Sequence, residues 1–155
     1  MKYKIAEILC VIAAAVFIAF SLSMNAETDK TAELISKEIT QEISDFELIS
    51  RDGRFLKKTL DISPDEIEEF AYFSSDNIMD VSELLVIKLG ESSDASEISE
   101  KLEKYIDSRY NIFAAYAPEQ GELLKNNILK KSGNIILMYV GKDADGVQDT
   151  FAEIV

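Results

Sequence analysis

Carboxylates are the most abundant chemically active side chains in this chain of 155 residues. The chain holds 29 Asp and Glu residues against 16 Lys and Arg residues, with one cysteine and no histidine. Without histidine there is no imidazole general base, and the Ser–His and Cys–His nucleophile pairs of many hydrolases are excluded. Zinc sites built from Cys and His are excluded as well. Carboxylate chemistry is the main enzymatic alternative that remains.

A pair of carboxylates can hydrolyse a glycosidic bond when an acid and a base face each other across a cleft. Glu83 and Glu119 form one conceivable pair. Of the 29 acidic residues, 28 lie after residue 26. With so many carboxylates, some pair lies at a suitable distance in any fold, so the sequence singles out no pair.

The segment DADGVQD, residues 143–149, is similar to part of a calcium-binding loop. Hard cations need several oxygen ligands that converge from one loop, and Asp143, Asp145 and Asp149 near Gly146 would supply carboxylates. The spacing lacks the glutamate that closes an EF-hand, and Asp-Gly is first of all a turn signal. We therefore interpret the segment as a turn and expect no metal site.

Two more groupings have both a chemical and a structural interpretation. Tyr116 and Glu119 could present an aromatic ring and a carboxylate to a sugar or peptide at a helix end. Alternatively, Tyr116 closes the core and the proline that follows ends the helix. Ser132 with Lys131 as its base could be a nucleophile, but the adjacent Gly-Asn pair indicates a hairpin turn. The sequence thus predicts no catalytic, cofactor-binding or metal-binding residue and no cofactor.

One long apolar run precedes the acidic part of the chain. The 19 residues from Ile8 to Ala26 are all uncharged, and as a helix they would span roughly 28 Å, close to the ~30 Å hydrocarbon core of a bilayer. The run has no polar stripe, unlike a buried helix of a soluble protein. We therefore predict that residues 1–26 are a signal anchor or transmembrane segment, which contacts the membrane through residues 8–24. Lys2 and Lys4 favour a cytoplasmic N-terminus and an extracytoplasmic C-terminal domain.

Cleavage and lipid attachment are the alternatives to a permanent anchor. Small residues at Ala19, Ser21 and Ser23 would allow a signal peptidase to cut, which would release a secreted domain. The apolar run is long for a cleaved signal, whose apolar region is typically ~7–15 residues. Cys10 lies near the start of the run and follows the bulky Leu9, whereas a lipid-attachment cysteine follows the apolar region and a small residue. We therefore favour an uncleaved anchor in which Cys10 is an apolar filler.

The remaining residues combine helical and strand patterns without repeats or a low-complexity linker. We predict a juxtamembrane helix and turn over residues 27–60 and an extracytoplasmic α+β domain over residues 61–155. The first expected elements are a helix over 29–46, a turn at 52–53, a short capped helix from Ser63 and strands over 70–75 and 82–90. They are followed by a long helix from Asp94 to before Pro118, a short helix over 118–126, a hairpin of strands 128–131 and 135–140, and a C-terminal helix with Val147, Phe151 and Ile154 on one face. An antiparallel sheet packed on the long helix is the simplest arrangement.

Part of this pattern resembles a known family. The segments SELLVIKL before the long helix, YAPE at its end and GNIILMYVG in the hairpin resemble a domain of unknown function, from about Asp61 to Phe151. That domain is found in exported or membrane-tethered proteins of Gram-positive, clostridia-like bacteria. The resemblance implies a location at the cell envelope, and it implies no activity. Members of the family often carry a lipid-attachment signal, from which the position of Cys10 departs.

The charge balance narrows the classes of partner. The formal net charge is −13, and without Lys2, Lys4 and Glu7 the chain carries 14 basic and 28 acidic side chains, or −14. Nucleic acids and anionic lipid headgroups are bound through Lys and Arg, so we expect no nucleic-acid partner. We expect a membrane-anchored extracytoplasmic domain with a non-catalytic binding or accessory role toward an unidentified protein or cell-envelope component. A carboxylate-dependent enzyme acting on cell-wall glycans or peptides is the alternative, and a cation-responsive accessory subunit is a third hypothesis.

Two sets of substitutions in the full chain test the anchor. Cys10→Ser should leave the protein in the membrane fraction, because the apolar helix rather than a lipid retains it. Val16→Asp combined with Phe17→Asp should release it, because each charge at the centre of a bilayer costs about 3 kcal/mol on insertion scales. Immunoblots of membrane and soluble fractions measure both. Loss of retention in the serine variant would support lipid attachment instead.

Overall fold

The computed structural model of the chain describes residues 12–14, 27–44 and 47–155. The predicted membrane segment, residues 1–26, lies outside these residues apart from 12–14, as do Cys10 and the conceivable cleavage positions. Among the described residues, no helix is both long and apolar enough to cross a membrane. The membrane-spanning helix therefore stays a prediction.

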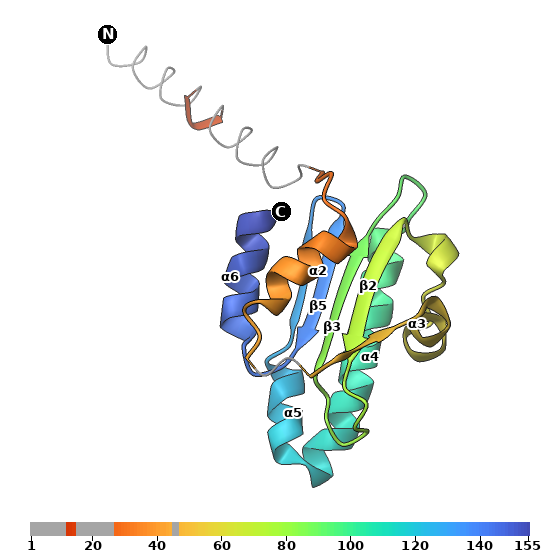
Figure 1. Cartoon of the computed structure of the whole chain (residues 1–155), viewed down its shortest axis with the longest axis vertical. Helices are drawn as coiled ribbons and strands as arrows, with labels where there is room; N and C mark the ends of the chain where they lie inside the picture. Colours follow the sequence, from red (N-terminus) through yellow and green to blue (C-terminus); the bar gives the residue numbers. More distant parts are fainter. Residues whose placement is uncertain (1–11, 15–26, 45–46) are drawn as a thin grey trace.

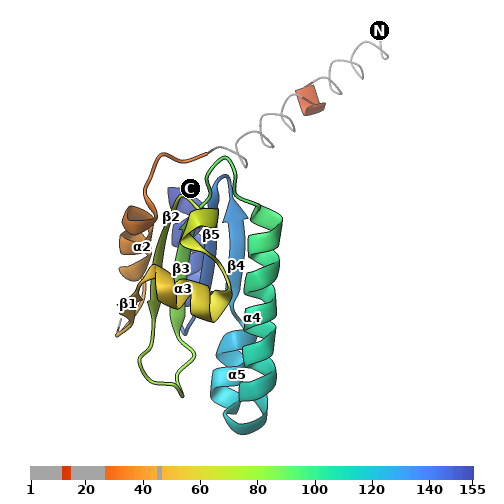
Figure 2. The same ribbon diagram turned by 90° about the vertical axis from the view of Figure 1, so that its right-hand side faces the viewer.

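Five antiparallel strands form a sheet between two layers of helices (Figure 1, Figure 2). Side by side, the strands are β1 (Ile49–Arg51), β2 (Glu69–Ser74), β3 (Glu83–Lys88), β5 (Ile135–Val140) and β4 (Ile128–Ser132). One face is covered by α2 (Ala32–Thr40) and α6 (Ala144–Ile154). The other face carries α3 (Gly53–Leu60), the 3-10 turn η1 (Pro64–Glu66), α4 (Ala95–Tyr116) and α5 (Pro118–Lys125). The predicted α+β class, with an antiparallel sheet packed on a long helix, is confirmed, and α2 and α6 add a second layer.

The two central strands are covered on both faces, which explains why their sequences are almost continuously apolar. All six residues of β5 are buried, as are the first five of β3. Side chains of β3 alternate between two clusters: Leu85 and Ile87 pack with α4, whereas Leu84 and Val86 pack with α2. Glu83 has the same parity as Leu85, so it points toward α4. A carboxylate therefore occupies a core position at the start of a central strand.

The long helix begins and ends where its sequence predicts. The Asp94 carboxylate accepts hydrogen bonds from two N–H groups of the first turn, both at 3.0 Å, which satisfies donors that have no partner within the helix. Its buried stripe consists of Ile98, Leu102, Ile106 and Phe113. Tyr105 and Arg109 lie one turn apart beside this stripe and reach Glu83 on the sheet.

Two local predictions differ from the structure, and one strand was not predicted. Asp52-Gly53 is not a turn, because the Asp52 carboxylate accepts a hydrogen bond from the N–H of Phe55 at 2.9 Å and caps α3. A Cβ at Gly53 would lie 2.6 Å from Cγ of Pro64, so close packing requires this glycine. The segment after Ser63 forms only the turn η1, without a hydrogen bond from a capping side chain. Strand β1 has no sequence signal, since three residues are too few to show a period.

Hydrogen bonds join the segment before α2 to the β4–β5 turn. The N–H of Thr28 donates to Oδ1 of Asn134 at 3.0 Å, and Nδ2 of Asn134 donates to the Thr28 carbonyl at 3.3 Å. The N–H of Ala32, in the first turn of α2, donates to the Glu69 carboxylate at 3.1 Å. Residue 28 therefore lies at the end of the sheet that carries the β4–β5 turn, opposite the β2–β3 loop (Figure 1).

Candidate functional site

The carboxylate of Glu83 is the centre of a hydrogen-bonded cluster between the sheet and α4. Its side chain has 0% relative exposure. Oε1 accepts a hydrogen bond from Nη1 of Arg109 at 2.5 Å. Oε2 accepts from the hydroxyls of Tyr72 at 2.9 Å and Tyr105 at 3.1 Å. Both carboxylate oxygens thus have donors, as a buried charge requires.

Different elements hold the members of this cluster. Glu83 is the first residue of β3, and Tyr72 lies on the neighbouring strand β2. Tyr105 and Arg109 are four residues apart on α4, so they share one side of that helix. Nη1 of Arg109 also donates to the Tyr105 hydroxyl at 3.0 Å. The cluster therefore fixes the position of α4 relative to two strands.

A second arginine lies on the same side of the sheet. Arg51, the last residue of β1, donates through Nε to the Ser74 hydroxyl and through Nη2 to the Ser75 carbonyl, both at 2.8 Å. Its guanidinium lies 4.5 Å from the centroid of the Phe55 ring. Its ion pair with Asp76 is longer, at 3.4 Å, and the Asp76 side chain is 82% exposed. Arg51 is thus held mainly by neutral groups.

These side chains line an open cleft of about 290 Å³. Its walls come from β1, β2, the start of β3, α3, α4 and the β2–β3 loop, which contributes Asp76, Asn77, Ile78 and Asp80. Ile78 is 87% exposed. The cleft therefore combines two arginines, carboxylates and tyrosine hydroxyls with an exposed apolar side chain.

Burial controls the ionisation of the cluster. Burial raises the pKa of the Glu83 carboxyl above its ordinary value, although Arg109 and the two tyrosine hydroxyls oppose this rise. Burial, together with the charge of Glu83, also raises the pKa of Tyr72 and Tyr105, so both tyrosines stay protonated and act as donors. Partial burial of Asp80 works to raise the pKa of its carboxyl, but hydrogen bonds, chiefly from Ser82, lower that pKa overall. The cleft thus holds two carboxyls whose pKa values move in opposite directions.

The groupings that the sequence singles out do not come together at this cleft. Glu119 is exposed at the start of α5 and does not line the cleft beside Glu83. Tyr116 is 53% exposed, so it does not close the core. Ser132 pairs with its neighbouring strand in the β4–β5 hairpin, and Lys131 is exposed there. The structure therefore favours none of these combinations as a reactive pair.

The DADG segment begins a helix. Asp143 precedes the first residue of α6, and its carboxylate accepts hydrogen bonds from the N–H and the hydroxyl of Ser44, at 3.1 Å and 3.3 Å. Asp145 and Asp149 lie on α6 itself. In the part of the chain that the structure describes, no group of three or more Asp, Glu, Cys or His side chains is arranged to hold a metal ion. Asp143 instead links α6 to the segment after α2.

The sequence contains two signals for the cluster, one in the strand and one in the long helix. In SELLVIKL, Glu83 lies on the same face of the predicted strand as Leu85 and Ile87. A charged side chain on this core-facing side needs a partner of opposite charge or hydrogen-bond donors. Arg109 stands within the apolar stripe pattern of the long helix, which is the complementary signal. Tyr72 and Arg51 have no signal of this kind, because they reach the cleft only through the pairing of strands.

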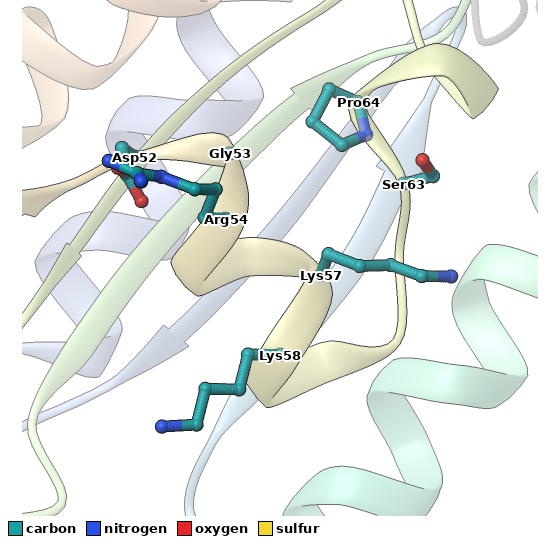
Figure 3. A pocket seen from close by; sticks show the side chains of 7 residues that line it. All are labelled: Asp52, Gly53, Arg54, Lys57, Lys58, Ser63 and Pro64. Atoms are coloured by element: carbon teal, nitrogen blue, oxygen red, sulfur yellow. The ribbon is translucent and has the colours of Figure 1, made fainter.

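A second hollow lies between α3 and the turn that follows it (Figure 3). It is larger, about 610 Å³, and Arg54, Lys57 and Lys58 line it. Arg54 pairs with Asp52 at 3.3 Å and Lys57 with Asp61 at 3.0 Å, all with exposed side chains. None of the side chains that line this hollow is a buried polar group that could fix a ligand. We therefore place the candidate site in the cleft beside Glu83.

Residues 41–141 match the model of a family described as a domain of unknown function, DUF4358. The chain belongs to the DUF4358 family. The DUF4358 match confirms the resemblance to a domain of unknown function that the sequence motifs indicate. The matched range, residues 41–141, contains every residue that lines the cleft, whereas α2 and α6 lie outside this range. No curated protein and no solved structure matches the chain.

The raised pKa of Glu83 predicts how stability depends on pH. A carboxyl with a higher pKa in the folded state contributes stability that is present at low pH and is lost as the pH rises through the folded pKa. The free energy of unfolding of the wild type, minus that of Glu83→Gln, should therefore increase as the pH falls toward the ordinary value of 4.5. Urea unfolding of the full chain, followed by circular dichroism at several pH values, measures this difference.

Glu119→Gln is the matched control, since it removes an exposed carboxylate outside the cleft. Its difference from the wild type should change little over the same pH range. If the difference for Glu83→Gln shrank as the pH fell, Arg109 would be holding the pKa of Glu83 below its ordinary value, and the prediction would be wrong.

Proposed function

We propose that this DUF4358 chain is a membrane-anchored domain that works outside the cytoplasmic membrane and binds a small ligand without transforming it. The observation that carries the proposal is the buried Glu83, held by an arginine and two tyrosine hydroxyls on the wall of an open cleft. Burying such a group is costly even when it is paired. Ionisable groups with shifted pKa values in clefts cluster at functional sites.

The geometry of the cluster favours binding over catalysis. A general base must come within about 3 Å of the proton it removes, directly or through one water. Glu83 has no exposed surface, and both of its oxygens already accept hydrogen bonds. Arg51 and Arg109 also line the cleft, and guanidinium groups bind anionic groups strongly without transforming them.

The location rests on the N-terminal sequence. The apolar run from Ile8 to Ala26 and the preceding Lys2 and Lys4 support an anchor with the domain outside. Thr28 lies at the β4–β5 end of the sheet, whereas the β2–β3 loop that borders the cleft lies at the opposite end (Figure 1). With an anchor before residue 27, the cleft would open away from the bilayer.

A carboxylate-dependent hydrolase of cell-wall glycans or peptides is the second candidate, and one observation favours it. Glu83 and Asp80 line the same cleft, and the pKa of Glu83 is raised while that of Asp80 is lowered. Opposite shifts of this kind are what a general acid and a general base need. The complete burial of Glu83 is the reason we rank this function second.

Labelling of cysteines in intact cells tests the location. Ser92 is exposed, so Ser92→Cys places a reactive cysteine on the surface of the domain. In a full chain that also carries Cys10→Ser, this cysteine should react with a membrane-impermeant maleimide added outside the cells. A cysteine introduced as Tyr3→Cys should react only after the cells are permeabilised. Gel-shift analysis measures both, and reaction of Ser92→Cys only after permeabilisation would contradict the proposal.

Incubation of the purified full chain with cell-wall material tests the non-catalytic role. The cell-wall glycans and peptides should remain intact after the incubation, as measured by mass spectrometry. Cleavage that disappears in Glu83→Gln would establish the hydrolase in place of the binding function.

A further inference from the structure

The cleft presents charges of both signs within one small volume. Arg51 and Arg109 line it from β1 and α4, and Asp76 and Asp80 line it from the β2–β3 loop. We propose that it binds a small zwitterion of the α-amino acid class, with the carboxylate at the arginines, the ammonium at the aspartates and the side chain toward Ile78. This ligand class rests on the proposed binding function of the cleft.

Hydrogen bonds fix both guanidinium groups in place, and each group still has N–H donors without an acceptor. Arg51 donates through Nε and Nη2, and Arg109 through Nη1. No group among residues 27–44 and 47–155 accepts a hydrogen bond from Nη1 of Arg51 or from Nε and Nη2 of Arg109. Every buried side-chain nitrogen and oxygen of the described residues has a hydrogen-bond partner. These three nitrogens have none, so they must be accessible to solvent. Arginine makes its strongest hydrogen bonds to carboxylates, often with two parallel N–H donors.

The aspartates supply the opposite charge at the same cleft. The Asp76 side chain is 82% exposed, and its contact with Arg51 is long for an ion pair, at 3.4 Å. A ligand carboxylate at Arg51 would take the place of Asp76 there and leave Asp76 to pair with an ammonium group. Asp80 accepts hydrogen bonds from the N–H of Ser82 at 2.9 Å and from its hydroxyl at 2.7 Å, which hold this carboxylate in position.

Size and net charge select a small neutral ligand. The volume of about 290 Å³ is just below the ~300–1,000 Å³ that is usual for small-molecule sites. Residues 27–155 carry 14 basic and 28 acidic side chains, so a ligand with several negative charges would be repelled. A zwitterion carries no net charge, yet it pairs with both kinds of charge in the cleft. Phe55 and the exposed Ile78 offer apolar surface to its side chain.

Calorimetric titration of the purified full chain in detergent micelles tests this ligand class. The probes are the L- and D-forms of alanine, leucine and phenylalanine, and the dipeptide dileucine. Two analogues of leucine each lack one charge: 4-methylpentanoate has only the carboxylate, and 3-methylbutylamine has only the ammonium group. A free amino acid and the ends of a short peptide share the same chemistry, and comparison of leucine with dileucine distinguishes these two sources.

At least one zwitterion should bind with a Kd below about 1 mM. The two leucine analogues, each without one charge, should bind with a Kd at least about tenfold higher than that of leucine, because a charged hydrogen-bonding group loses its partner. Asp76→Asn should weaken binding of the zwitterion but not of the carboxylate-only analogue, whereas Arg51→Gln should weaken both. Asp149→Asn, on α6 across the sheet, is the control and should change neither.

Three results would overturn the ligand class. The first is that no probe binds at about 10 mM. The second is that leucine and 4-methylpentanoate bind equally well. The third is that neither Asp76→Asn nor Arg51→Gln changes the binding. Asp76 is exposed, so its variant tests the proposal even if Arg51→Gln fails to fold. None of these results decides the proposed function, which fails only through the cysteine labelling or the cleavage of cell-wall material.

Discussion

A carboxylate at a core-facing position of a central strand must find donors or keep its proton, because an isolated buried charge costs several kcal/mol. Glu83 is in this situation at the start of β3. Its partners come from β2 and from the middle of α4, which lie far apart along the chain. The packing of the long helix on the sheet therefore depends on one polar contact as well as on the apolar stripe around it.

The same contact places one of the two arginines that line the cleft. Arg109 must lie close to the sheet to reach Glu83, and this brings one end of its guanidinium to the wall of the cleft. Arg51 on β1 approaches from the edge of the sheet, where the Phe55 ring and the Ser74 hydroxyl hold it. The β2–β3 loop then adds aspartates beside these arginines. A structural requirement of the core thus fixes one guanidinium at the wall of a polar cleft.

The long elements could be predicted from the sequence, and the short or paired ones could not. The long helix repeats its apolar stripe from Ile98 to Phe113, and the Gly133-Asn134 pair marks the hairpin, so both predictions agree with the structure. Strand β1 has three residues, and Asp52-Gly53 suits both a turn and a helix start. The sequence points to Glu83 as one conceivable acid, but with Glu119 as its partner. Its real partners depend on strand pairing and on how α4 packs, which a single sequence does not show.

A double-mutant cycle at Glu83 and Arg109 tests most directly whether the fold depends on this contact. The free energies of unfolding of the full chain would be measured for the wild type, Glu83→Gln, Arg109→Met and the double variant. We predict that the double variant loses less stability than the sum of the two single losses, with a coupling energy of about 1–3 kcal/mol. Additive losses, with a coupling below about 0.5 kcal/mol, would contradict a central role for the pair.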